Sequence, residues 1–137
     1  MAAGFVERAV EGVAILLWAA DADAPHRLAT PFAVAAAAAA LELPVELYFS
    51  ARCVRLLLPG VAAGLRASQA EPVPHARTVA DAMREALDHG ARFYACSDAL
   101  AAQGLTLQML TPECSGHGGA LQFAARAGDA RWRALVF

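Results

Sequence analysis

The chain has 137 residues, a formal net charge of −2 and 58% hydrophobic residues. This length predicts one domain over residues 1–137, because domains cluster around about 100 to 150 residues. No apolar run reaches the roughly 18 residues that a membrane span needs, and Glu7 and Glu11 are unlike the basic start of a signal peptide. Lys and Arg form no cluster typical of nucleic-acid binding. We therefore expect a cytoplasmic protein with no membrane or nucleic-acid partner.

The first half of the chain predicts a β-α-β unit. Residues 13–20, VAILLWAA, are a continuous apolar run of the kind seen in central parallel strands covered on both faces. The alanine-rich segment 26–42 predicts a helix, because alanine has the highest helix propensity. Residues 45–50, VELYFS, alternate apolar and more polar side chains, which predicts a strand with one wetter face. The order strand, helix, strand favours parallel pairing.

Past this unit, residues 51–60 predict a short helix that Pro59 and Gly60 end, and residues 64–76 predict a surface loop. A second long helix is expected to follow. Thr78 and Asp81 resemble a capping box at its start, and Gly90 is a suitable residue just beyond its end.

The last third predicts further alternation of strands and helices. Residues 91–96 indicate a third strand, and residues 97–104 a short helix with Ser97 as its N-cap. The pattern leaves the segment 105–119 open, because LTLQML alternates like a strand while the helical stretch GALQFAARAG needs a strand or loop just before it. Residues 131–137 alternate as a terminal strand. The α/β class follows, with a sheet of about five strands.

Chemistry-bearing side chains gather after the predicted strands. Ligands of open parallel sheets bind at the carboxyl ends of the strands. The candidates at this rim are Asp21 and His26 after the first strand, Cys53 after the second, and Cys96, Ser97 and Asp98 after the third.

Cys96 is the strongest candidate nucleophile. It lies where a strand runs into a helix, and the unpaired N–H groups at a helix start stabilise a thiolate. The alternative is that Cys96 ends a buried strand as a small hydrophobic residue. Asp21 is expected to cap the first helix, and His26 to be a solvated residue near the rim that could contact a substrate.

The three cysteines do not form a disulfide framework. Cys53 is expected to pack, with a secondary thiol role as the alternative. Cys114 and His117 have a C-x2-H spacing that could bind zinc with Cys53 and Cys96, but a lone pair is a weak signal and no metal is expected. The chain contains no GxGxxG, P-loop, GxSxG or HExxH motif, so the sequence predicts no cofactor.

The segments ILLWAAD, ATPFAVAAAAAALELPVELYFS, VRLLLPGV, FYACSDALAAQGL and WRALVF, in this order, resemble the DsrE/DsrF-like family. The resemblance runs from about residue 13 to the end. It implies a small α/β domain with a largely parallel sheet between helices, assembled as trimers or hexamers. It also implies a helical turn and loop at LTLQMLTPE, with the next strand nearer residues 113–117.

By this resemblance Cys96 matches the cysteine with which sulfur-relay members, such as the DsrE and TusD subunits, accept and pass on a persulfide sulfur. The leading hypothesis is therefore a cytoplasmic sulfur carrier. It would take sulfur from a donor and pass it to an acceptor, each a protein or a small thiol. Cys53 or Cys114 could act as a resolving thiol. Ser97, Asp98 and His117 are candidate binding residues at the rim, near the path by which a partner reaches the Cys96 sulfur.

Two other hypotheses belong to different classes of function. One is a non-catalytic oligomeric subunit that binds a small molecule or a protein and whose cysteines only pack. The other is a Cys/His metal site. The apolar excess also predicts a closed homo-oligomer, a trimer or hexamer by resemblance, that uses the surface around LLLPGVAAGL and the alanine helix.

Overall fold

A computed structural model describes residues 9–19, 22–67 and 76–137. Its five strands form one sheet in the order β4-β3-β2-β1-β5, and every neighbouring pair is parallel. The strands are β1 Gly12–Leu17, β2 Val45–Phe49, β3 Arg92–Ala95, β4 Cys114–His117 and β5 Trp132–Val136. The α/β class predicted from the sequence is confirmed, and the sheet is parallel throughout.

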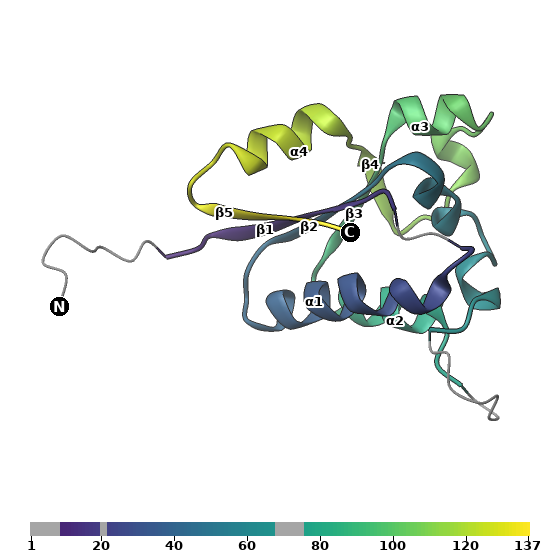
Figure 1. The fold of residues 1–137 in the computed structure, drawn as a ribbon, viewed down its shortest axis with the longest axis horizontal. Helices are drawn as coiled ribbons and strands as arrows, with labels where there is room; N and C mark the ends of the chain where they lie inside the picture. Colours follow the sequence, from purple (N-terminus) through teal and green to yellow (C-terminus); the bar gives the residue numbers. More distant parts are fainter. Residues whose placement is uncertain (1–8, 20–21, 68–75) are drawn as a thin grey trace, which may run out of the picture.

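Helices cover both faces of this sheet (Figure 1). Helices α1 and α2 lie on one face, and α4 lies on the other with α3 near the carboxyl ends of the strands. The four α-helices are α1 Ala29–Ala40, α2 Val79–Asp88, α3 Ser97–Ala102 and α4 Ala120–Ala127. Short 3-10 helices are η1 Pro25–Arg27, η2 Ala51–Leu57, η3 Ala62–Gly64 and η4 Leu107–Met109.

The main core lies between the sheet and helices α1 and α2. Alternate residues of a strand face the same side, so Ile15 and Leu47 point together toward α1 and are fully buried. Three aromatic rings fill the centre of this core at centroid separations of 5.0 to 6.1 Å, those of Phe32, Phe49 and Phe93. The alanines of α1 add little bulk, which lets the helix pack close to the sheet and to α2.

Several local predictions hold. β1 lies between β2 and β5, as its apolar run predicted, but the strand ends at Leu17 and Trp18 just beyond it is 55% exposed. The capping box is present, because the Thr78 hydroxyl accepts from the Asp81 amide at 3.1 Å and the Asp81 carboxylate accepts from the Thr78 amide at 2.9 Å. The segment 105–119 follows the family pattern, with η4 followed by β4.

Other local predictions are wrong in detail. The expected helix 26–42 is divided into η1 and α1, and the short helix after β2 is a 3-10 helix. Ser97 is not the N-cap of α3: Cys96 holds that position and Ser97 is the first helical residue. Most of the loop predicted at 64–76 lies outside the described residues, and in its described part Arg66 pairs with Thr78 in an isolated bridge. None of the described helices is long and apolar enough to cross a membrane.

Candidate functional site

Cys96 lies at the junction between β3 and α3, as the N-cap residue of the helix. Its amide donates to the Phe49 carbonyl of β2 at 2.9 Å, which continues the sheet by one residue. Its carbonyl accepts from the Leu100 amide at 3.0 Å, which closes the first turn of α3. These two bonds fix the backbone on both sides of the thiol, and its side chain is half-buried.

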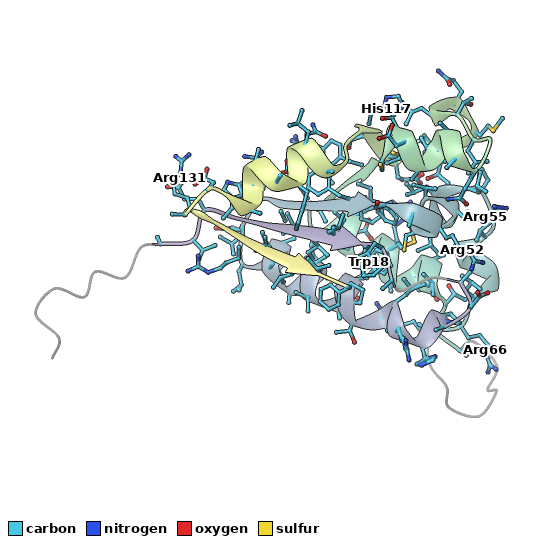
Figure 2. The ribbon with its side chains drawn as sticks, turned by 45° about the horizontal axis from the view of Figure 1, so that its top comes forward. Trp18, Arg52, Arg55, Arg66, His117 and Arg131 are labelled. Atoms are coloured by element: carbon cyan, nitrogen blue, oxygen red, sulfur yellow. The ribbon has the colours of Figure 1, made fainter. Side chains whose placement is uncertain are left out.

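The Cys96 thiol lines a groove of about 460 Å³ at the carboxyl edge of the sheet. Two strand-to-helix junctions build this groove, one from β3 to α3 and one from β4 to α4. The lining residues are Cys96, Ser97 and Asp98 from the first junction, and His117, Gly118, Gly119, Ala120, Leu121 and Gln122 from the second. We call this space the Cys96 groove; His117, on its rim, is labelled in Figure 2.

Two glycines shape the wall opposite the sulfur. The Gly118 amide donates to the Ala95 carbonyl at 2.9 Å, which brings the β4–α4 loop against the end of β3. A Cβ atom added to Gly119 would lie 3.1 Å from the Cys96 Sγ atom, closer than an ordinary contact. A side chain at residue 119 would therefore crowd the thiol, and glycine keeps the space at the sulfur open.

The structure brings together four of the predicted site residues: Cys96, Ser97, Asp98 and His117. Among the described residues that line the groove, Asp98 and His117 are the ionisable groups besides the thiol. Asp98 lies in the first turn of α3.

The other candidates lie elsewhere. Cys53 is fully buried within η2 and belongs to the hydrophobic core, and Cys114 is half-buried. The Cys114 thiol donates to the Gly116 carbonyl at 3.5 Å, and burial raises the pKa of this thiol above its usual value. His26 lies in η1 before α1, and Asp21 is outside the described residues.

In the part of the chain that the structure describes, no three His, Cys, Asp or Glu side chains lie close enough together to hold a metal ion. Sequence reasoning did not single out Gly118 and Gly119. The signal available was the pair of glycines directly before a helical stretch, since adjacent glycines permit a close approach between loops.

The fold and the groove define a small all-parallel α/β protein with a half-buried thiol at the carboxyl edge of its sheet. The chain belongs to the DsrE/DsrF-like family, whose model matches residues 13–131. Among solved structures it is similar in fold to the YchN protein from E. coli, with a TM-score of 0.65. That match has 13% identity and covers 93% of this chain and 100% of the YchN chain. The comparison with curated proteins found no match.

Proposed function

We propose that this protein is a cytoplasmic sulfur carrier that holds sulfur as a persulfide on Cys96. The observation that supports this most is the position of the thiol, half-buried at the end of β3 and facing a groove that Gly119 keeps open. Membership of the DsrE/DsrF-like family is consistent with a protein of the sulfur-relay type. The donors and acceptors are expected to be proteins or small thiols.

The transfer needs no oxidant or reductant. The Cys96 thiolate attacks the outer sulfur of a donor persulfide, R–S–SH, and the bond between the two donor sulfurs breaks as the new sulfur–sulfur bond forms. The products are Cys96–S–SH and R–S⁻, which takes a proton from water. An acceptor thiolate then attacks the outer sulfur and releases the Cys96 thiolate. The outer sulfur changes partners without a net change in oxidation state.

Intact-mass spectrometry after incubation with a small-molecule persulfide tests this proposal. The wild-type chain is expected to gain one sulfur, about 32 Da, and to lose it again on treatment with a reductant. The gain should be one sulfur per chain, because Cys53 is fully buried and burial raises the pKa of the Cys114 thiol. No gain with two chemically different donors would contradict the carrier function.

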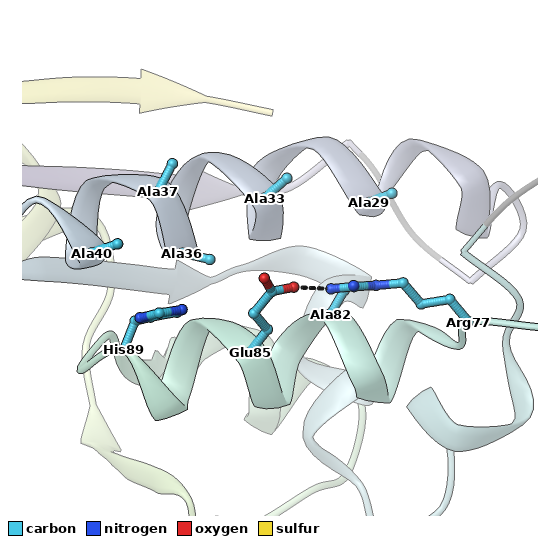
Figure 3. A pocket seen from close by; sticks show the side chains of 9 residues that line it. All are labelled: Ala29, Ala33, Ala36, Ala37, Ala40, Arg77, Ala82, Glu85 and His89. Carbon is cyan, nitrogen blue, oxygen red and sulfur yellow. Dashed lines mark hydrogen bonds and ion pairs between the residues drawn. The ribbon is translucent and has the colours of Figure 1, made fainter.

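Apolar surface supports an assembled form of the protein. Large apolar side chains that are mostly exposed include Leu121 at 86% and Leu41 at 75%. A second apolar surface is a groove of about 350 Å³ between α1 and α2 (Figure 3). It is lined by Ala29, Ala33, Ala36, Ala37, Ala40, Arg77, Ala82, Glu85 and His89. The segment 56–65 offers less surface than its sequence suggested, because Leu56 and Leu57 are buried in the core.

We expect a homo-oligomer, a trimer or hexamer, with α1 at the interface. Small alanine side chains let helices of two subunits approach closely, and burial of the apolar surface stabilises the contact. Light scattering coupled to size exclusion at tens of micromolar should then give a trimer or a hexamer of the 14.3 kDa chain. A mass of one chain under these conditions would show that the apolar surface stays exposed to water. A mass of one chain would also count against the competing hypothesis, a non-catalytic oligomeric subunit that binds a small molecule or a protein.

A further inference from the structure

Helix α4 lies against β1 and β5, but its side chains are mostly exposed. None of its eight residues is buried, and only Phe123 and Arg126 are half-buried. These two residues are three positions apart and so share the face of the helix toward the sheet. A helix of this length is not stable alone in water, so these contacts must hold it in place.

The last turn of α4 is tied to β2 by a charged cluster. Arg126 donates to both carboxylate oxygens of Glu46, from Nε at 2.7 Å and from Nη2 at 3.2 Å. The Tyr48 hydroxyl donates to the same carboxylate at 2.8 Å. The Arg126 guanidinium also lies 3.9 Å from the centre of the Trp132 ring on β5. The Glu46 side chain is only 14% exposed, so this ion pair is less screened by water than the surface pairs.

Tyr48 connects this cluster to the Cys96 groove. Its ring stacks on Tyr94 at 5.5 Å and meets the ring of Phe123 edge-on at 6.0 Å. Tyr94 in turn lies against the loop that leads into α4, because a Cβ atom added to Gly118 would lie 2.6 Å from the Tyr94 Cβ atom. Burial, and then the hydrogen bond to Glu46, raise the pKa of Tyr48 above its ordinary value, so its hydroxyl stays a donor.

We propose that Glu46 and Arg126 are positioning residues that fix the wall of the Cys96 groove. They hold the last turn of α4 against β2, and this keeps its first turn and the two glycines before it, residues 118–122, beside the thiol. The role rests on the proposed function, in which Cys96 is the working thiol. When the cluster is broken, α4 lifts, the groove widens and Cys96 becomes more accessible.

The alkylation rate of Cys96 by a bulky maleimide, followed on the peptide that contains it, tests this proposal. Arg126→Met removes both hydrogen bonds to Glu46, and we expect the rate to rise about tenfold, which corresponds to ~1.4 kcal/mol. Arg126→Lys keeps the charge but not the two-pronged geometry, and its rate should be intermediate. Arg84→Met is the matched control. Arg84 lies on α2, which covers the other face of the sheet, and its replacement removes an ion pair with Glu113.

Equal rates in the wild type, Arg126→Met and Arg84→Met would overturn the proposal, as would an equal rise in both methionine variants. If Arg126→Met does not fold, hydrogen exchange in Arg126→Lys gives the answer. The Phe123 amide, which donates to the Gly119 carbonyl, should exchange several-fold faster than in the wild type while the amides of α1 are unchanged. Unchanged exchange at Phe123 would overturn it. Alkylation does not depend on sulfur transfer, so failure of Cys96 to accept sulfur is a separate result.

Discussion

Cys96→Ser is expected to abolish the gain of sulfur, whereas Cys53→Ser and Cys114→Ser are expected to keep it. A serine hydroxyl forms no persulfide, and only a thiolate attacks the donor sulfur at a useful rate. Cys53 is fully buried, and burial raises the pKa of Cys114, so neither thiol offers an accessible thiolate near neutral pH. The measurement is intact mass after incubation with the persulfide donor, on the three variants and the wild type in parallel.

The serine variants are also expected to differ in how much they destabilise the fold. Cys96 is half-buried at the surface groove, so its replacement by serine should cost less than about 1 kcal/mol of unfolding free energy. Cys53→Ser buries a hydroxyl in the core and should cost more. Thermal unfolding separates these effects from chemistry. A sulfur gain that survives in Cys96→Ser and disappears in Cys114→Ser would transfer the carrier role to Cys114.

Patterns that depend on neighbouring residues were predictable from the sequence. The capping box of Thr78 and Asp81 needs only the spacing of two side chains within one helical turn. The buried run of β1 follows from a strand with both faces covered, and this strand lies inside the sheet. The rim position of Cys96 follows from the same reasoning, because a strand end and a helix start are both local features.

Features that depend on distant segments were not predictable in the same way. Tyr48 was expected on the wetter face of β2, yet it is 2% exposed because Phe123 and Tyr94 pack against it. Glu46 and Arg126 are separated by 80 residues, and no spacing rule connects them. The same holds for the wall of the Cys96 groove, since the β3–α3 and β4–α4 junctions meet only through the pairing of β3 with β4.

Cys96 and Ser97 show where local rules give the wrong detail. Serine is a favoured N-cap residue, so the sequence favours Ser97 as the cap of α3. The structure shifts the helix start by one residue, because the Cys96 amide is used by the sheet while its carbonyl already accepts the first helical bond. The shift matters for chemistry, since it places the thiol itself at the point where the strand becomes the helix.

Gly119→Val is expected to slow sulfur acceptance by Cys96 on the order of tenfold to a hundredfold, because a small misplacement at a reacting atom has effects of this size. The new Cβ atom would lie 3.1 Å from the Cys96 Sγ atom, and the two further methyl groups would occupy the groove through which the donor approaches. The time course of the mass gain gives the rate. Gly64→Val is the matched control, since a Cβ atom there meets nothing within 4 Å. An unchanged rate in Gly119→Val, with its fold intact by circular dichroism, would mean that the donor reaches the sulfur from outside this groove.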